Sequence, residues 1–186
     1  MIRSKEELRQ YLETDKIALD RKGKRPSFTD VIWKFQINLR YYEYYLNCKS
    51  GVLGGVKCRY YYFKHFILSV LCGFSIPPNV FGKGLSIAHR GTIIVNSHSK
   101  IGNNCRLHAC VNIGTTPGVP DAAPTIGDNV YIAPGVKIYG SIHIGNGVVI
   151  GANAVVNKDF LEDNVTIAGI PAKIISYKGR AEVESN

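Results

Sequence analysis

The stretch Ile126 to Val155 decides the fold. It reads IGDNVY, IAPGVK, IYGSIH, IGNGVV and IGANAV, and a further unit in the same frame, VNKDFL, starts at Val156. A period of six fits neither a helix, which repeats every 3.6 residues, nor a simple strand, which alternates every two. Six residues make one short strand and one corner, so three units close a triangular coil of about 18 residues. We therefore predict a solenoid with inward aliphatic residues and corners of glycine and asparagine.

The same period occurs in a second frame closer to the N-terminus. The units VNSHSK, IGNNCR, LHACVN and IGTTPG start at Val95, Ile101, Leu107 and Ile113. The two frames do not join, because the interval from Ile113 to Ile126 is one position longer than two repeats. The extra length falls in TTPGVPDAAP, which predicts a projecting loop near residues 115–125, a common place for function on a solenoid. The predicted inward column is Ile101, Leu107, Ile113, Ile126, Ile132, Ile138, Ile144 and Ile150.

The segment before the repeats has a different composition and predicts helices. Up to Cys72 it holds 14 of the 23 Lys and Arg residues, 7 of the 14 Asp and Glu residues, and eight of the 11 tyrosines. A capping box at Ser4 starts a first helix, residues 27–30 offer a second N-cap, and a third helix is expected over Lys57–Cys72 after a turn-rich link at 47–55. We predict a helical segment over 1–72, a β-helix domain over 73–178 and a polar tail over 179–186.

Composition excludes several classes of protein. The five cysteines contain no C-x-x-C pair, so neither a disulfide framework nor a zinc site is expected. The N-terminus lacks the apolar core of a signal peptide, and the apolar stretch Phe66–Ile76 is too short to span a bilayer. We expect a cytoplasmic protein. The basic, tyrosine-rich helices indicate either a solvated face whose tyrosines pack on the next domain or a surface for peripheral contact with a membrane or a lipid-linked glycan. No motif accompanies the charge to suggest nucleic acid.

Three segments carry a resemblance to a known family: GKGLSIAHRGTIIVN at 82–96, LHACVNIG at 107–114 and AGIPAK at 168–173. Over roughly residues 73–178 the chain resembles the left-handed parallel β-helix acyltransferases. Within them it is most similar to serine acetyltransferases and to acetyltransferases of bacterial surface-polysaccharide synthesis. The resemblance implies an all-β left-handed parallel β-helix, a hexapeptide-repeat solenoid, behind an N-terminal α-helical segment. It also implies a homotrimer that uses acetyl-CoA as co-substrate and requires no metal.

The resemblance assigns the catalytic role to His89, because IAHRG matches the stretch that carries the family's histidine. Imidazole suits this role, since attack of an alcohol on a thioester needs a base with a pKa near neutrality. His108 lies two coil flats later and is a candidate substrate contact. Asn96 and Asn112 are candidates to bind acceptor hydroxyls, because their amides both donate and accept hydrogen bonds.

The same resemblance implies a groove for coenzyme A. Small residues in YIAP and IGAN match positions where the pantetheine arm lies close to the backbone, and lysines in VNKD and IPAK match positions that meet its phosphates. The predicted cofactor-binding residues are Ala133, Pro134, Gly151, Ala152, Lys158 and Lys173.

Departures from the serine enzymes lead to a prediction about the acceptor. Ala88, Ala122 and Ala123 stand where those enzymes present charged side chains, and FSIPP at 74–78 lacks their upstream acid. A bound zwitterion needs a charged partner at each end. We therefore predict an O-acetyltransferase acting on a hydroxyl of a sugar or surface polysaccharide. The alternatives are a serine O-acetyltransferase of cysteine biosynthesis and a non-catalytic trimeric β-helix scaffold.

Overall fold

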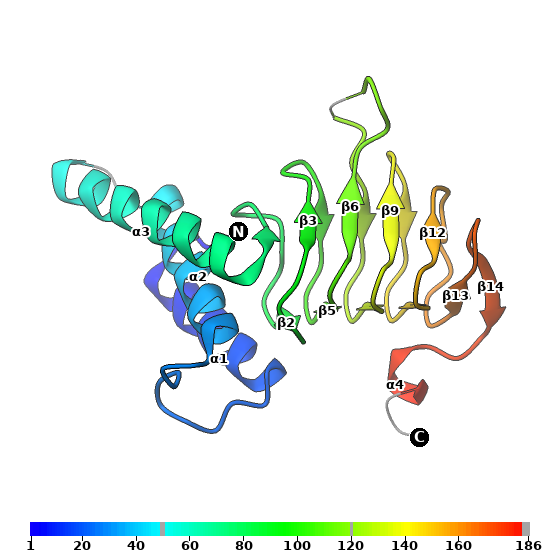
Figure 1. The fold of residues 1–186 in the computed structure, drawn as a ribbon, viewed down its shortest axis with the longest axis horizontal. Coiled ribbons are helices and arrows are strands. Elements are labelled where there is room, and N and C mark those ends of the chain that lie inside the picture. The colour runs from blue at the N-terminus through cyan, green and yellow to red at the C-terminus, as the bar shows by residue number, and fades with distance from the viewer. Residues whose placement is uncertain (49–50, 120, 184–186) are drawn as a thin grey trace.

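The computed structural model describes residues 1–48, 51–119 and 121–183 and shows a helical layer beside a β-helix (Figure 1). The helices are α1 (Lys5–Ala18), α2 (Val31–Cys48) and α3 (Gly51–Cys72), and a short α4 (Arg180–Val183) follows the last strand. None of the helices in these ranges has both the length and the apolar character needed to cross a membrane. The division of the chain at residues 72 and 178 stays a prediction.

Short strands form three sheets that run along the coil, all parallel except the final pair β13 and β14. Sheet A contains β1 (Phe74–Ser75), β3 (Ile93–Val95), β6 (Asn112–Gly114), β9 (Lys137–Tyr139) and β12 (Val155–Val156). Sheet B contains β4 (Lys100–Ile101), β7 (Thr125–Ile126) and β10 (His143–Ile144). Sheet C contains β2 (Ser86–Ile87), β5 (Arg106–Leu107), β8 (Tyr131–Ile132), β11 (Val149–Ile150), β13 (Thr166–Ala168) and β14 (Lys173–Ser176).

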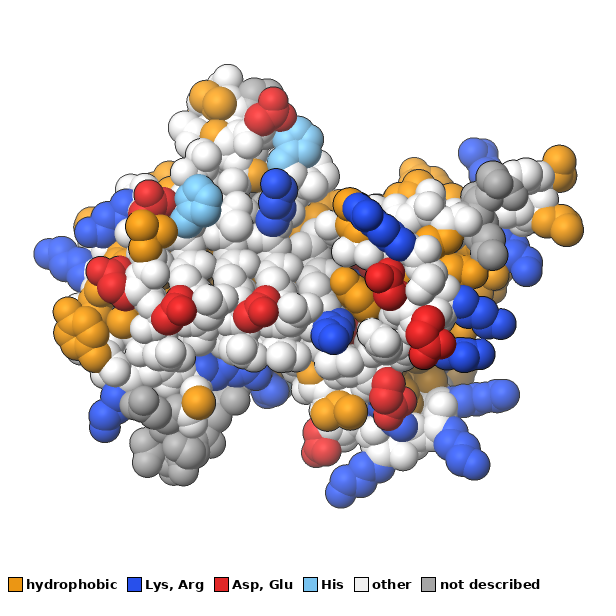
Figure 2. All heavy atoms as spheres, turned by 180° about the vertical axis from the view of Figure 1, so that it is seen from behind, with side chains coloured by type: hydrophobic (Ala, Val, Ile, Leu, Met, Phe, Trp, Pro, Cys, Tyr) orange, Lys and Arg blue, Asp and Glu red, His pale blue; other side chains and the backbone are white. Residues whose placement is uncertain are grey.

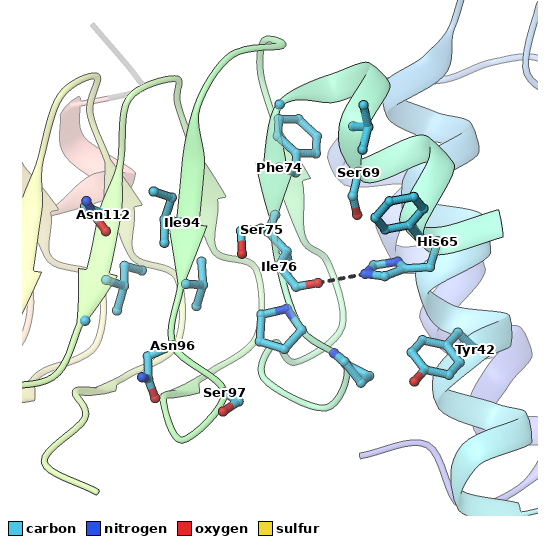
Figure 3. Close-up of a pocket in the computed structure, with 18 of the residues that line it drawn as sticks. Tyr42, His65, Ser69, Phe74, Ser75, Ile76, Ile94, Asn96, Ser97 and Asn112 are labelled. Atoms are coloured by element: carbon cyan, nitrogen blue, oxygen red, sulfur yellow. Dashed lines mark hydrogen bonds between the residues drawn. The ribbon is translucent and has the colours of Figure 1, made fainter. Parts of the chain in front are cut away.

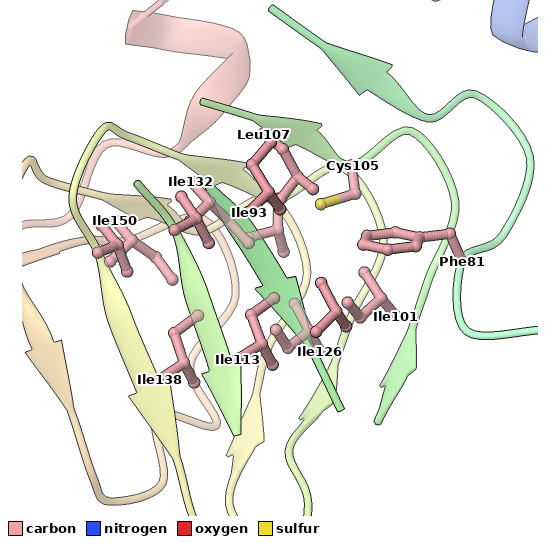
Figure 4. Close-up of a cluster of buried hydrophobic side chains, with 14 of the residues drawn as sticks. Phe81, Ile93, Ile101, Cys105, Leu107, Ile113, Ile126, Ile132, Ile138 and Ile150 are labelled. Atoms are coloured by element: carbon pink, nitrogen blue, oxygen red, sulfur yellow. The ribbon is translucent and has the colours of Figure 1, made fainter. Parts of the chain in front are cut away.

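The inward column predicted from the hexapeptides is confirmed (Figure 4). Each of its eight residues is at most 4% exposed, and they join one continuous core. Ile132 pairs with Ile150 and Ile126 with Ile144, so equivalent positions lie three hexapeptides apart, which is one turn of the coil. The parallel solenoid therefore follows directly from the sequence period.

The predicted projecting loop leaves the coil between β6 and β7 (Figure 1). Across the turn that contains it, Ile113 pairs with Ile138, a longer separation than the three hexapeptides of a regular turn. The interval from Ile113 to Ile126 therefore replaces a single repeat, not two. Most of residues 115–119 and 121–125 are exposed or half-buried, and residue 120 lies outside the described residues.

The helix starts largely follow the predicted caps. The Ser4 hydroxyl accepts a hydrogen bond from the Glu7 amide at 3.0 Å, and the Asp30 carboxylate accepts one from the Trp33 amide at 3.2 Å. The predicted start of the third helix at Lys57 is wrong, because α3 already begins at Gly51. Each glycine in the first turns of α3 lowers helix stability by about 1 kcal/mol. The stacking of α3 tyrosine rings on those of α2 outweighs this cost.

A buried charge cluster fastens the helices to the first coil. The Arg40 guanidinium of α2 donates to Asp15 of α1 at 2.8 Å and to Glu43 at 3.0 Å. It also donates to the carbonyls of Phe81 and Gly82 in the first coil, at 3.1 and 2.7 Å. These bonds fix the helical layer at the N-terminal end of the β-helix, next to the segment that carries His89.

Candidate functional site

His89 lies at the corner between β2 in sheet C and β3 in sheet A, and its side chain is exposed. The corner is held by the Ala88 amide, which donates to the Leu107 carbonyl at 2.9 Å, and by the Gly91 amide, which donates to the Cys72 carbonyl at 3.0 Å. Within the described part of the chain, the His89 imidazole has no hydrogen-bond partner. The ring is therefore free to meet an acceptor hydroxyl at this corner.

The structure brings His108 next to His89, with ring centroids 6.0 Å apart. His108 follows β5, one full coil turn of three strands after β2, so the expected separation of two flats is wrong. Its ring centroid lies 5.1 Å from that of Tyr131. The side chain is buried, and its Nε2 has no hydrogen-bond partner among the described residues. Burial lowers the pKa of His108, and the charges of Arg106 and His89 lower it further. His108 is therefore a neutral imidazole with an unused polar nitrogen beside the candidate base.

A column of small residues continues from the two histidines along the same edge of sheet C. Backbone bonds stack it: the His108 amide donates to the Ile132 carbonyl, the Ala133 amide to the Ile150 carbonyl and the Gly151 amide to the Ile167 carbonyl. Space is restricted here, because a Cβ on Gly151 would lie 2.9 Å from the Cβ of Ala168. The stacking of neighbouring coils at this edge therefore requires small side chains.

Five of the predicted cofactor-binding residues lie on or beside this column. Ala133 and Gly151 belong to it, and the exposed Pro134 and Ala152 follow them directly in the chain. Lys173 pairs with Ala168 at the far end. We call this row, from His89 to Lys173, the corner column.

Lys158 does not join the corner column. It lies between β12 of sheet A and Phe160, which bridges to Ile144 of sheet B, so it occupies a different corner of the coil. Its Nζ lies 5.4 Å from the centroid of the Phe160 ring. Within one chain, the two predicted lysines therefore cannot hold one phosphate group together.

The two predicted asparagines line a groove of about 840 Å³ between sheet A and α3 (Figure 3). Asn96 and Asn112 lie on its sheet side, and Tyr42 and His65 lie on its helical side. The His65 Nε2 is 2.9 Å from the Ile76 carbonyl oxygen, while its buried Nδ1 has no partner among the described residues. His89 does not line this groove. One chain thus presents the candidate base and the candidate hydroxyl-binding amides in separate places.

Two basic or titratable groups escaped the sequence interpretation. Arg106 precedes the inward-facing Leu107, so it points outward on the same side of β5 as His108 and acts on its pKa. His65 was not among the candidates from the sequence, yet it lines the groove. The i, i+2 spacing between Arg106 and His108 in the sequence could have identified Arg106. No sequence pattern identifies His65, because only the packing of α3 brings it to the groove.

The remaining histidines, His98 and His143, lie beside acidic side chains and away from the corner column. His98 Nδ1 lies 2.8 Å from Asp121 Oδ1, which ties the projecting loop to the coil, and His143 lies beside Asp159. Ala122 and Ala123 are half-buried in the loop. Among residues 1–48, 51–119 and 121–183, no group of three metal-binding side chains comes together.

Comparison with known proteins confirms the resemblance to hexapeptide-repeat transferases. Residues 123–158 match the family model "Bacterial transferase hexapeptide (six repeats)". The serine acetyltransferase of Staphylococcus epidermidis is 38% identical over 110 residues, which cover 58% of this chain and 51% of that protein. That of Bacillus subtilis is 33% identical over 129 residues, 67% of this chain and 59% of that protein. The chain thus spans about half the length of the curated relatives it matches.

The fold is similar to that of solved serine acetyltransferases. The structure of serine acetyltransferase in complex with coenzyme A from Brucella abortus superposes with a TM-score of 0.70 at 26% identity, covering 94% of this chain and 70% of that chain. These relatives overturn one prediction. The sugar or polysaccharide acceptor is wrong, because the similar proteins in both comparisons are serine acetyltransferases. Missing charged side chains were too weak a basis for excluding serine, since other cations can lie near the site.

Proposed function

We propose that this chain is a serine O-acetyltransferase that transfers the acetyl group of acetyl-CoA to the serine hydroxyl, on a β-helix of left-handed sense. The observation that carries the proposal is the placement of His89 at the head of the corner column, the position that the serine acetyltransferase resemblance assigns to the base. The similarity in sequence and fold to serine acetyltransferases supports the substrate.

His89 acts as the general base. Its imidazole removes the proton from the serine hydroxyl as the oxygen attacks the thioester carbonyl. The tetrahedral intermediate then collapses by breaking the carbon–sulfur bond, and the leaving thiolate takes the proton from His89. The neutral His108, with its unused Nε2, is placed to bind the serine or the intermediate beside the base.

The corner column suits acetyl-CoA. Its small side chains leave the backbone accessible to a pantetheine arm, and exposed Lys173 at the far end would meet a phosphate. Pro134 and Ala152 form its outer edge. Lys158 would contribute only to a molecule held at another corner, and so to a site shared with a neighbouring subunit.

Serine also needs a cation for its carboxylate. Ala88, Ala122 and Ala123 cannot supply one. Arg106 is the alternative, because it lies beside His108 and forms no ion pair within the described residues. We include Arg106 in the proposal as the carboxylate-binding residue.

The proposal includes a homotrimer. Within one chain, His89 and the groove that contains Asn96 and Asn112 are separate. A heterologous contact between three copies would place the groove of one subunit opposite the histidine corner of the next. Light scattering should give three times the subunit mass of 20.5 kDa. A monomer would refute the shared site.

The test is thiol release from acetyl-CoA with and without L-serine. We expect serine-dependent release that falls by about 10² to 10⁴ in kcat for His89→Ala, while His143→Ala, the exposed control that pairs with Asp159, retains activity. If the wild type releases no more thiol with L-serine than His89→Ala does, the proposal fails. That result would favour the non-catalytic scaffold.

A further inference from the structure

The face of α3 that points away from the molecule is apolar. Val52 is 84% exposed, Leu53 80% and Val70 68%, values expected for charged side chains on an ordinary surface helix. The complete set of exposed apolar residues on this face, here called the outer face, is Val52, Leu53, Val56, Tyr60, Phe63, Ile67, Val70 and Leu71.

Helical geometry places these residues on one stripe. Three- and four-residue steps lead from Val52 through Val56, Tyr60, Phe63 and Ile67 to Val70 and Leu71. They keep the side chains on one side of the helix over about 30 Å. The opposite side is the packed one, where Leu68 is buried and the Tyr61 ring stacks on Tyr41 and Tyr45 of α2. Nothing in the described ranges of the chain covers the outer face.

Basic side chains flank the outer face. Lys57 and Lys64 lie along one edge and Arg59 along the other, while α3 contains neither Asp nor Glu. The Lys64 Nζ lies 5.9 Å from the centroid of the Tyr60 ring, so cation and aromatic ring are side by side. Figure 2 shows hydrophobic side chains among those of Lys and Arg at the helical end.

We propose that the outer face docks on an anionic lipid bilayer, with α3 lying in the plane of the interface. An apolar stripe with aromatic rings and a basic rim is the pattern of an interfacial helix, whose apolar side enters the acyl boundary while its cations meet acidic head groups. α3 cannot cross the bilayer, and lying on the surface requires no such span.

Charge and polarity decide against other partners. A second copy packed face to face would bring Lys57, Arg59 and Lys64 of two chains together with no acid on either helix. The other partner predicted for these helices is a lipid-linked glycan, whose sugar part offers hydroxyls and not hydrocarbon to a surface of valine, leucine and phenylalanine. An anionic bilayer offers acyl chains to the apolar stripe and acidic head groups to the basic side chains that flank it.

The test is sedimentation of the full chain with vesicles. One set is pure phosphatidylcholine and the other is phosphatidylcholine and phosphatidylglycerol in equal parts. We expect binding to the anionic set that weakens as salt rises. The double variant Val56→Ser/Phe63→Ser should lose binding, and Lys57→Gln/Lys64→Gln should weaken it about fivefold per charge removed.

A matched control uses the other end of the molecule. Ile175→Ser/Lys178→Gln changes two exposed residues on and after β14 and should bind like the wild type. Each variant is checked by circular dichroism and light scattering. The proposal is overturned if the wild type does not sediment with anionic vesicles, or if Val56→Ser/Phe63→Ser still sediments with them. It is also overturned if that variant lowers the oligomeric mass, which would show that another copy covers the face. None of these readouts depends on acetyl transfer.

Discussion

Replacing Arg40 by methionine tests how the helices are held on the β-helix. The change keeps a long side chain but removes the charge and every donor. Asp15 and Glu43 lose their cation, and the Phe81 and Gly82 carbonyls lose a donor. Burial alone would lower the pKa of Arg40, but the two carboxylates raise it above its ordinary value, so the wild-type guanidinium is firmly charged.

The expected cost follows from burial. The side chains of Arg40, Asp15 and Glu43 are 0%, 3% and 1% exposed, and removing one partner of a buried pair costs about 3–5 kcal/mol. Asp15 keeps the amides of Gly84 and Leu85, at 2.7 and 2.9 Å, which favours the lower half of that range.

The assay is urea unfolding followed by Trp33, the sole tryptophan, which is buried on the same helix. The control is Arg21→Met, which removes the same charge from the partly exposed ion pair with Asp30 and should cost about 0–1 kcal/mol. If Arg40→Met costs no more than Arg21→Met, the cluster does not fasten the helices.

Three further results are expected. In a nitrogen-detected titration, the pKa of His108 should lie below its ordinary value of about 6.5, so its neutral form persists to lower pH. Arg106→Gln should raise this pKa, because it removes a nearby positive charge. A His108 pKa that is the same in Arg106→Gln and the wild type would contradict the role of Arg106. Ile138→Ala, at a side chain only 1% exposed, should lower the free energy of unfolding by about 2–5 kcal/mol. The control Ile175→Ala, at a side chain 65% exposed, should change that free energy little. Equal urea midpoints for the two variants would refute the inward position of Ile138. Ala152→Phe places a large ring on the exposed edge of the corner column. It should raise the KM for acetyl-CoA at least about tenfold, equivalent to about 1.4 kcal/mol of binding free energy, without changing the circular dichroism spectrum. An unchanged KM would mean that coenzyme A binds elsewhere.

The sequence by itself determined the parts of this protein that depend on neighbouring residues. The six-residue period specifies a strand and a corner at each repeat, so the inward position of Ile138 and the projecting loop could be predicted without coordinates. The helix caps at Ser4 and Asp30 are equally local, because a side chain bonds an amide three residues away. The period can be recognised in the sequence because every repeat needs an aliphatic residue at the same inward position.

Only the tertiary structure decided which distant groups meet. Arg40 reaches Asp15 on another helix and Gln36 reaches the Leu85 carbonyl in the first coil, and no spacing rule connects them. The contact of His89 with His108, and the separation of His89 from the groove with Asn96, likewise depend on how the coil stacks. The outer face of α3 is the clearest case, since its apolar residues suggest a core in the sequence and become a surface only because α2 covers the other side.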